Sequence, residues 1–235
     1  VRTRAVSGLG FMAGSASRAI DAINDAIDDP SERVRTNAAY ALGVIGTLES
    51  VALLSKRLND DREGVQLAAA HGLAQAGTVA IPVLIEGLKS ADEKVRSFSA
   101  FALGDMGNLS GGDAAIALTE LVYDESVRVR YTVAEALGII GADSQIVVNA
   151  LTTLLKDENG QVRYEAAYAL ARLGKSAASA VGALSEALRD VENRYVSGHS
   201  ATALKRINSS EANEALIDYL SYSRWCPLTS KESTF

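Results

Sequence analysis

Few side chains in this sequence could carry out chemistry, and their spacing does not favour it. The 235 residues include two histidines, His71 and His199, and one cysteine, Cys226. A zinc site needs about three or four His, Cys or carboxylate ligands at suitable spacing, and these three side chains lie far apart in the chain. Neither a P-loop nor a G-x-S-x-G nucleophile motif is present. The sequence therefore predicts no catalytic, cofactor-binding or metal-binding residues.

Cys226 lies next to Trp225 in a C-terminal tail, residues 222–235. Three roles for this tail remain open: it covers the exposed apolar edge of the preceding helices, it binds a partner, or it offers a reactive thiol to a cofactor or a mixed disulfide. We expect the covering role, because only Arg224 nearby would lower the pKa of the thiol. A lone cysteine excludes an intrachain disulfide and fits a reducing compartment.

The charge balance limits the partners. The formal net charge is −6 and the isoelectric point is about 5.1. An acidic chain is a poor binder of duplex nucleic acid or anionic lipid, both of which attract basic surfaces. We find no apolar run approaching the ~18 to 20 residues of a membrane span and no signal-peptide pattern, so we expect a soluble intracellular protein.

A stretch of thirteen residues recurs along the chain. It reads VRTNAAYALGVIG from Val34 to Gly46, and close variants follow. The copies begin at Val1, Val34, Val65, Val95, Val129, Val162 and Val196. Their spacing of 30 to 34 residues is typical of a solenoid or repeat array. Because the chain opens inside the motif, we expect the first repeat to be truncated at its N-terminus.

Each copy of the motif has the pattern of a helix. Apolar residues lie at the motif valine and four, eight and eleven positions later, as in Val34, Ala38, Leu42 and Ile45, a helical period. The glycines expected to end these helices as left-handed caps are Gly46, Gly77, Gly107, Gly141 and Gly174. A second, looser helical pattern lies between copies. The sequence thus predicts an all-α fold, a right-handed α-solenoid of about seven helical hairpins over residues 1–221.

An acidic turn precedes most copies, and arginine is usually the second motif residue. We interpret these side chains as a structural ladder of charge-assisted hydrogen bonds within and between repeats; solvated surface charges are the alternative. The predicted ladder residues are Asp29, Arg35, Arg96, Asp124, Arg130, Asp157 and Arg163, with Asp60, Asp92 and Asp190 in the other turns. Gln66 and Ser197 replace arginine, so we expect the ladder to be weakest around the third repeat and at the C-terminal end.

Variable residues three and six positions after the motif valine predict a binding ridge. In solenoids the surface formed by such helices is usually concave and binds partners, and aromatic side chains concentrate at protein interfaces. The alternative is that the rings pack between adjacent helices. The residues predicted to bind a protein partner are Tyr40, His71, Phe98, Phe101, Tyr131, Glu135, Tyr164, Tyr168 and His199.

The motif resembles the HEAT repeat, and more narrowly the short-period HEAT-like repeat of the phycobilisome lyases. The resemblance implies a protein-binding scaffold or assembly factor, with a link to phycobilisome or photosystem assembly. It implies as an alternative a lyase or lyase subunit that handles a bilin chromophore, with Arg4, Arg172 and Arg206 facing the bilin propionates. A location in the cytoplasm or plastid stroma, with thylakoid association, would follow. The iron-binding HEAT-repeat enzymes, the deoxyhypusine hydroxylases, carry His-Glu pairs that are missing here.

Overall fold

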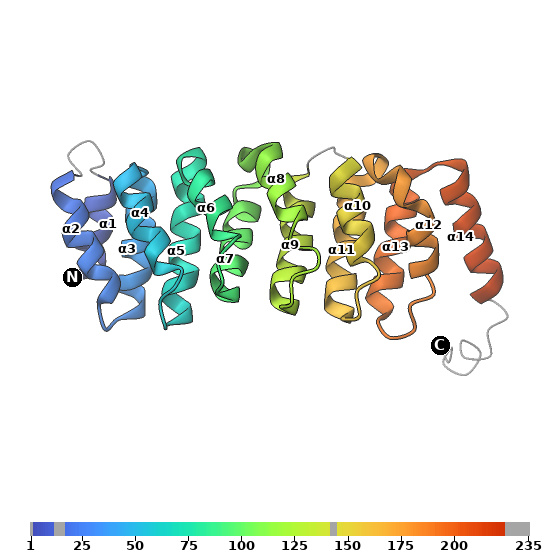
Figure 1. Cartoon of the computed structure of the whole chain (residues 1–235), viewed down its shortest axis with the longest axis horizontal. Coiled ribbons are helices and arrows are strands. Elements are labelled where there is room, and N and C mark those ends of the chain that lie inside the picture. Colours follow the sequence, from blue (N-terminus) through green and yellow to red (C-terminus); the bar gives the residue numbers. More distant parts are fainter. Residues whose placement is uncertain (1, 12–16, 142–144, 224–235) are drawn as a thin grey trace. The chain divides into compact units, whose positions relative to one another are not determined.

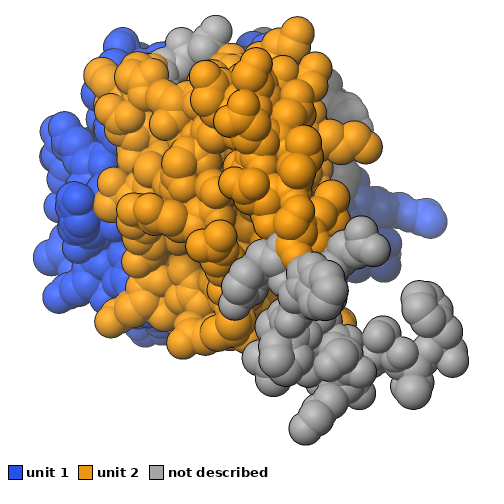
Figure 2. Space-filling model, turned by 90° about the vertical axis from the view of Figure 1, so that its right-hand side faces the viewer, with its two compact units in different colours: residues 1–140 blue, residues 141–235 orange. Residues whose placement is uncertain are grey.

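The computed structural model describes residues 2–11, 17–141 and 145–223, and the regular structure of these residues is helical (Figure 1). Contacts divide the chain into two compact units, Val1–Ile140 and Gly141–Phe235 (Figure 2). Each unit is described by itself. Trp225 and Cys226 lie outside the described residues, so the role of the tail stays a prediction.

Every copy of the motif forms one helix in the described residues. These motif helices are α1 (Arg2–Phe11), α3 (Glu32–Ile45), α5 (Glu63–Ala76), α7 (Glu93–Asp105) and α9 (Val127–Ile140) in unit 1, and α11 (Gly160–Leu173) and α13 (Arg194–Ile207) in unit 2. In unit 1 they lie side by side in sequence order (Figure 1). The predicted all-helical repeat fold is confirmed.

The looser pattern between motifs forms the second helix of each hairpin. These helices are α2 (Ser17–Asp25), α4 (Leu48–Arg57), α6 (Ile81–Gly87), α8 (Gly111–Thr119), α10 (Gln145–Leu154), α12 (Val181–Ala187) and α14 (Ser210–Ser223). Short 3-10 turns adjoin several of them: η2 (Ala26–Asp28), η3 (Gly77–Ala80), η4 (Gly107–Ser110) and η5 (Gly174–Ala180). The expected end of the array at residue 221 falls inside α14.

The predicted apolar stripe forms the core. In α9 the motif valine and the residues four and eight positions later, Val129, Val133 and Leu137, are fully buried. Burial of each such side chain contributes about 1.5 to 3 kcal/mol. The position eleven residues on is also buried in α9 and α13, at Ile140 and Ile207, but it is only half-buried at Ile45, the last residue of α3.

Small residues let neighbouring motif helices pack closely. A Cβ atom built on Gly43 of α3 would overlap the carbonyl of Gly72 in α5, and one built on Gly104 of α7 would lie 2.9 Å from Cα of Ala136 in α9. The alanine and glycine content of the motif thus sets the distance between repeats, because larger side chains would separate the backbones.

The five glycines expected to end motif helices all have positive φ angles, between 56° and 69°, which cost glycine little. Gly46 caps α3 in the predicted left-handed conformation, with ψ 22°. Gly77 and Gly174 end α5 and α11 with ψ −146° and −122°, outside that conformation, and the cap of α7 is Met106, one residue before Gly107. In α13 the cap is Asn208, with φ 54° and its N–H donated to the Leu204 carbonyl at 3.0 Å. Asparagine is the usual substitute at this position.

One helical stretch among the described residues, Glu63–Gly87, is long and apolar enough by length and composition to cross a membrane. It comprises α5, η3 and α6, and Gly77 ends α5 with φ 69°. Two of its three leucines, Leu73 and Leu84, are fully buried in unit 1, whereas Leu67 is 41% exposed. A buried core helix passes the same test, so the stretch is weak evidence for a membrane span.

The close approach of α3 and α5 makes a stability prediction. Gly43→Ala should destabilise the fold by about 3 kcal/mol, because the new methyl group meets main chain that cannot move aside. Gly198→Ala, on α13, is the matched control. A Cβ atom at Gly198 meets nothing within 4 Å, so the substitution should leave the stability of the fold unchanged or raise it by about 0.5 to 1 kcal/mol. Urea unfolding followed by circular dichroism measures both, and equal stabilities would contradict the packing argument.

Candidate functional site

Side chains of the turns join one repeat to the next. In unit 1 Arg96 is buried, and its Nη1 donates to the carbonyl oxygens of Ser90 and Ala91 at 2.9 and 3.0 Å. Nε and Nη2 of the same guanidinium donate to both carboxylate oxygens of Asp124 in the following repeat, at 2.7 and 2.9 Å. The hydrogen bonds to Asp124 raise the pKa of Arg96. One guanidinium thus binds the main chain of its own turn and the aspartate of the next turn.

Arg163 repeats this arrangement in unit 2. Nη1 donates to the carbonyl oxygens of Asp157 and Glu158 at 2.9 and 3.0 Å. Nε donates to Asp190 at 2.6 Å and Nη2 to Glu192 at 2.7 Å. Burial is the largest single effect on Asp190 and would raise its pKa, but the hydrogen bond and charge of Arg163, together with hydrogen bonds from the Asn193 and Glu192 N–H groups, outweigh it and the pKa is lowered. The pair therefore stabilises the folded state at neutral pH, and this contribution is lost as the pH falls below the usual range of aspartate.

The expected contact across each turn needs a correction. Arg35, Arg130 and Arg163 do reach the Asp six residues earlier, but they bind its main-chain carbonyl, at 2.9, 2.8 and 2.9 Å. The carboxylate accepts a hydrogen bond from the N–H two residues later, as Ser31 donates to Asp29 at 2.8 Å. Each carboxylate therefore shapes its own turn. Sequence spacing could not distinguish a carbonyl from a carboxylate on the same residue.

Asp92 does not belong to the column of turn aspartates. It lies three residues before the motif valine, whereas four of the others lie five residues before theirs. Ser90 occupies that equivalent position, and its hydroxyl accepts from the Asp92 N–H at 3.2 Å. Asp92 instead caps α7 by accepting from the Lys94 N–H at 2.8 Å.

The ladder loses both charges together between the third and fourth repeats. Gln66 replaces arginine and donates to the Leu58 carbonyl, eight residues earlier, at 3.2 Å, whereas Arg96 binds carbonyls five and six residues earlier. Ser90 replaces the aspartate that an arginine would have held. Gln66 Oε1 is buried and has no hydrogen-bond partner among the described residues. An unpaired buried amide oxygen costs about 1 to 3 kcal/mol, which is less than an unpaired buried charge.

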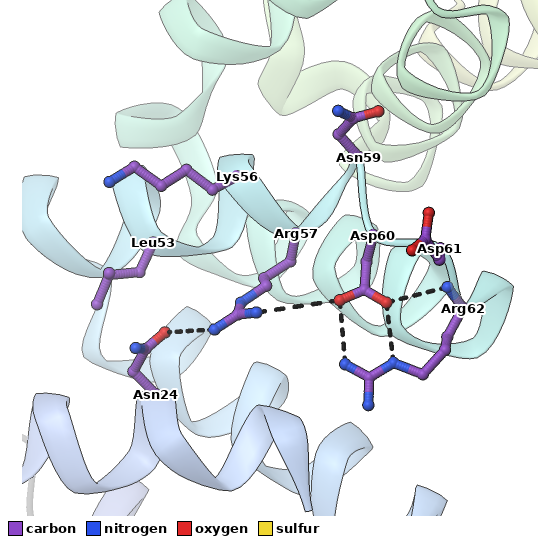
Figure 3. A pocket seen from close by; sticks show the side chains of 8 residues that line it. All are labelled: Asn24, Leu53, Lys56, Arg57, Asn59, Asp60, Asp61 and Arg62. Atoms are coloured by element: carbon purple, nitrogen blue, oxygen red, sulfur yellow. Dashed lines mark hydrogen bonds and ion pairs between the residues drawn. The ribbon is translucent and has the colours of Figure 1, made fainter.

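A second interruption, between the second and third repeats, was not expected. Asp60 is bound by Arg62 of its own turn, through Nε at 2.9 Å and Nη2 at 3.1 Å, which lowers the pKa of Asp60. Arg35 is left with a buried Nε that has no partner among the described residues. Figure 3 shows the Asp60 cluster, in which Arg57 also faces Asp60 and donates to Asn24. In this cluster the charges of Arg57 and Arg62 are offset by Asp60.

The chain itself suggests a test of the ladder. Arg96→Gln should destabilise the protein by about 3 kcal/mol, because it leaves the nearly buried Asp124 carboxylate without its guanidinium. Arg96→Gln with Asp124→Ser reproduces the natural Gln66 and Ser90 pair and should recover much of the loss. Thermal and urea unfolding measure both. A double variant no more stable than the single one would show that the charges do not act as a pair.

The motif-helix surface of unit 1 is curved inward. Arg128 on α9 reaches over α7 and donates to Glu63 on α5 at 2.9 Å. The Arg128 guanidinium lies 4.9 Å from the centre of the Phe98 ring on α7. Side chains two repeats apart can meet in this way only where the surface between them is concave.

The predicted ridge residues of unit 1 do not all lie on the open surface. Tyr40 is half-exposed, and His71 and Glu135 are exposed. Phe98, however, is only 4% exposed, so its expected place among the open ridge residues is wrong: Arg128 lies over its ring and covers it.

Side chains of the neighbouring helices α5 and α7 contact one another along the ridge. Phe101 and Tyr131 are half-buried. The His71 ring contacts Phe101 edge-on, with centres 5.1 Å apart, and His71 Nδ1 lies 3.1 Å from Asp105 Oδ2. Asp105, ten residues after its motif valine, was missed by sequence reasoning, which stopped at the sixth residue; one further helical turn would have included it.

In unit 2 the predicted Tyr164, Tyr168 and His199 come together. Their ring centres are 5.0 to 6.4 Å apart. Tyr195, which was not predicted, joins them edge-on to Tyr164 at 6.3 Å. Its signal in the sequence is its position four residues before His199, which places both rings on one face of α13. Burial lowers the pKa of His199, so the neutral imidazole is favoured.

The arginines implied by the bilin alternative are not gathered into one site in either unit. Arg4 belongs to unit 1, whereas Arg172 and Arg206 belong to unit 2. Arg206 donates to the Ala171 carbonyl at 2.9 Å, a structural use. No cluster of three or more His, Cys, Asp or Glu able to hold a metal ion occurs in residues 2–11, 17–141 and 145–223.

Comparison with known families agrees with this geometry. The model of the HEAT repeats matches residues 1–74, 81–153 and 148–225. The chain is a HEAT-repeat protein. No curated protein matches this HEAT-repeat chain.

Solved structures resemble the HEAT-repeat chain in fold. An engineered protein has 23% identity and a TM-score of 0.54 over 94% of this chain and 68% of its own. A designed armadillo repeat protein in complex with the peptide (KR)4 has 22% identity and a TM-score of 0.52 over 79% of this chain and 98% of its own. The CpcE and CpcF complex of phycocyanin lyase from Nostoc sp. PCC7120 has 22% identity over 94% of this chain and 88% of its own. Its TM-score of 0.44 is too low to carry an argument.

His199 predicts a pH dependence of stability. Because its pKa is lowered in the folded state, the unfolded chain binds a proton more readily, and stability should fall as the pH drops through the unfolded histidine range, near 6.5. Aspartates with lowered pKa lose their contribution only at more acidic pH. His199→Gln should therefore flatten the change in melting temperature between neutral and mildly acidic buffer. Identical pH profiles for the two proteins would contradict this assignment.

Proposed function

We propose that this HEAT-repeat protein is a non-enzymatic scaffold, an adaptor or assembly factor that holds a protein partner on its motif-helix surface. The observation that carries the proposal is the surface of unit 1, where Tyr40, His71 and Phe101 lie on successive motif helices beside exposed carboxylates. Aromatic side chains with polar neighbours are typical of protein interfaces, and HEAT and armadillo-like arrays commonly bind proteins along such surfaces.

A link to photosynthetic assembly is the finer form of this proposal. Its support is the likeness of the motif to the phycobilisome-lyase repeat. The bilin-handling alternative has the same support and no site geometry of its own. Stoichiometric binding of phycocyanobilin with a red shift of its absorbance would favour that alternative over the scaffold.

Site-specific photo-crosslinking tests the scaffold. A photoreactive amino acid placed at Tyr40 or Phe101 should cross-link to a defined protein in extract of the source cell. The same probe at Asp113, an exposed residue of α8 in the second-helix layer, is the control and should capture much less of that protein. Equal cross-linking from both layers would refute the proposed binding surface.

A further inference from the structure

The chain contains an internal example of how its unit 1 surface binds a cation. The Arg128 guanidinium lies 4.9 Å above the Phe98 ring while its Nη2 donates to Glu63 at 2.9 Å. A ring face and a carboxylate together hold the positive charge. Cation–π attraction and a charge-assisted hydrogen bond are each favourable, and a partly desolvated site strengthens both.

The same combination of ring and carboxylate recurs one helical turn further along the motif helices, where no arginine of the described residues fills it. One pocket there is lined by Phe101, Gly104, Asp105, Thr132, Glu135, Ala136 and Ile139. A neighbouring pocket is lined by Thr36, Tyr40, Ala68, His71, Ala74, Gln75 and Asp105. Rings and carboxylates line both pockets, and small residues form part of each. Among the residues that the structure describes, neither lining includes lysine or arginine.

Asp105 is placed against its local electrostatic preference. It is the last residue of α7, where the negative end of the helix dipole disfavours an acidic side chain. Its carboxylate lies 3.1 Å from His71 Nδ1, and both side chains are about half exposed. Asp105 lines both pockets at a position that the helix dipole disfavours for a carboxylate. Binding of a ligand explains this placement more easily than folding does.

We infer that these two pockets accept arginine or lysine side chains of an extended basic segment in the partner protein, with Asp105 and Glu135 binding the charge and Phe101 and Tyr40 flanking it. This deepens the proposed scaffold function and rests on it. All lining residues belong to unit 1, and the net charge of −6 favours encounter with a basic segment. Arginine suits the site better than lysine, because its planar group can stack on a ring while its N–H groups bind a carboxylate.

A peptide pair tests the inference with the whole chain. The probe is a fluorescein-labelled peptide of alternating arginine and serine, and its control carries citrulline, a neutral group of the same shape, in place of arginine. Fluorescence anisotropy should show binding of the arginine peptide that weakens with added salt. Asp105→Asn with Glu135→Gln should weaken it by about tenfold or more, because two charged acceptors are lost.

Matched variants separate a site from a general charge effect. Asp113→Asn with Glu120→Gln removes the same charge from exposed positions on and just after α8 and should leave binding nearly unchanged. Asp105→Lys with Glu135→Lys should transfer binding to a peptide of alternating glutamate and serine, a gain that misfolding cannot produce. Equal binding of the citrulline peptide, or equal loss in the α8 variant, would overturn the inference. If photo-crosslinking at Phe101 persisted in the Asp105→Asn, Glu135→Gln variant without loss, the scaffold would stand and the basic segment would be refuted.

Discussion

The close contact of neighbouring motif helices is the constraint on which the other features depend. A hairpin of two short helices cannot cover its own apolar stripe, so each repeat must lie against the next. Gly43 meets Gly72, and Gly104 meets Ala136, at distances that leave no room for another carbon atom. At this spacing an arginine of one repeat reaches an aspartate of the next, and side chains on the outer face of adjacent helices form shared pockets.

The charged ladder operates within this spacing as a system of matched pairs. Where an arginine is present, as at Arg96 and Arg163, its Nη1 binds carbonyl oxygens of its own turn, and its Nε binds the aspartate of the next turn. Where Gln66 replaces it, Ser90 replaces the partner. The exception is Arg35, because Arg62 has taken Asp60. Buried charges are costly when one partner is missing, which explains why a neutral pair is tolerated within the array.

On the outer face of the same helices the backbone repeats, but the exposed side chains differ from repeat to repeat. In unit 1 Arg128 crosses between repeats to cover Phe98, and the row one turn away remains open. In unit 2 Tyr164 and Tyr168 contact His199 instead, and Tyr195 contacts Tyr164. The two surfaces differ in charge as well as shape, since Arg172 and Arg206 lie on exposed positions of unit 2, whereas Asp105 and Glu135 lie on those of unit 1. The helical repeat is the same in both units, and the side chains available to a partner are the ones that vary.

The sequence by itself determined the helical repeat, its period, its buried stripe and its glycine caps, because these depend on spacing along one chain and on the conformational freedom of single residues. It also indicated which columns vary. Only the tertiary structure decided which side chains meet: that Arg128 covers Phe98, that Asp105 joins the ridge, that Arg62 displaces Arg35 from Asp60, and that the arginines bind carbonyls of their own turns. These contacts depend on the distance and curvature between repeats. That geometry arises from the packing of many helices together, and the identities of residues some 30 to 65 positions apart do not specify it.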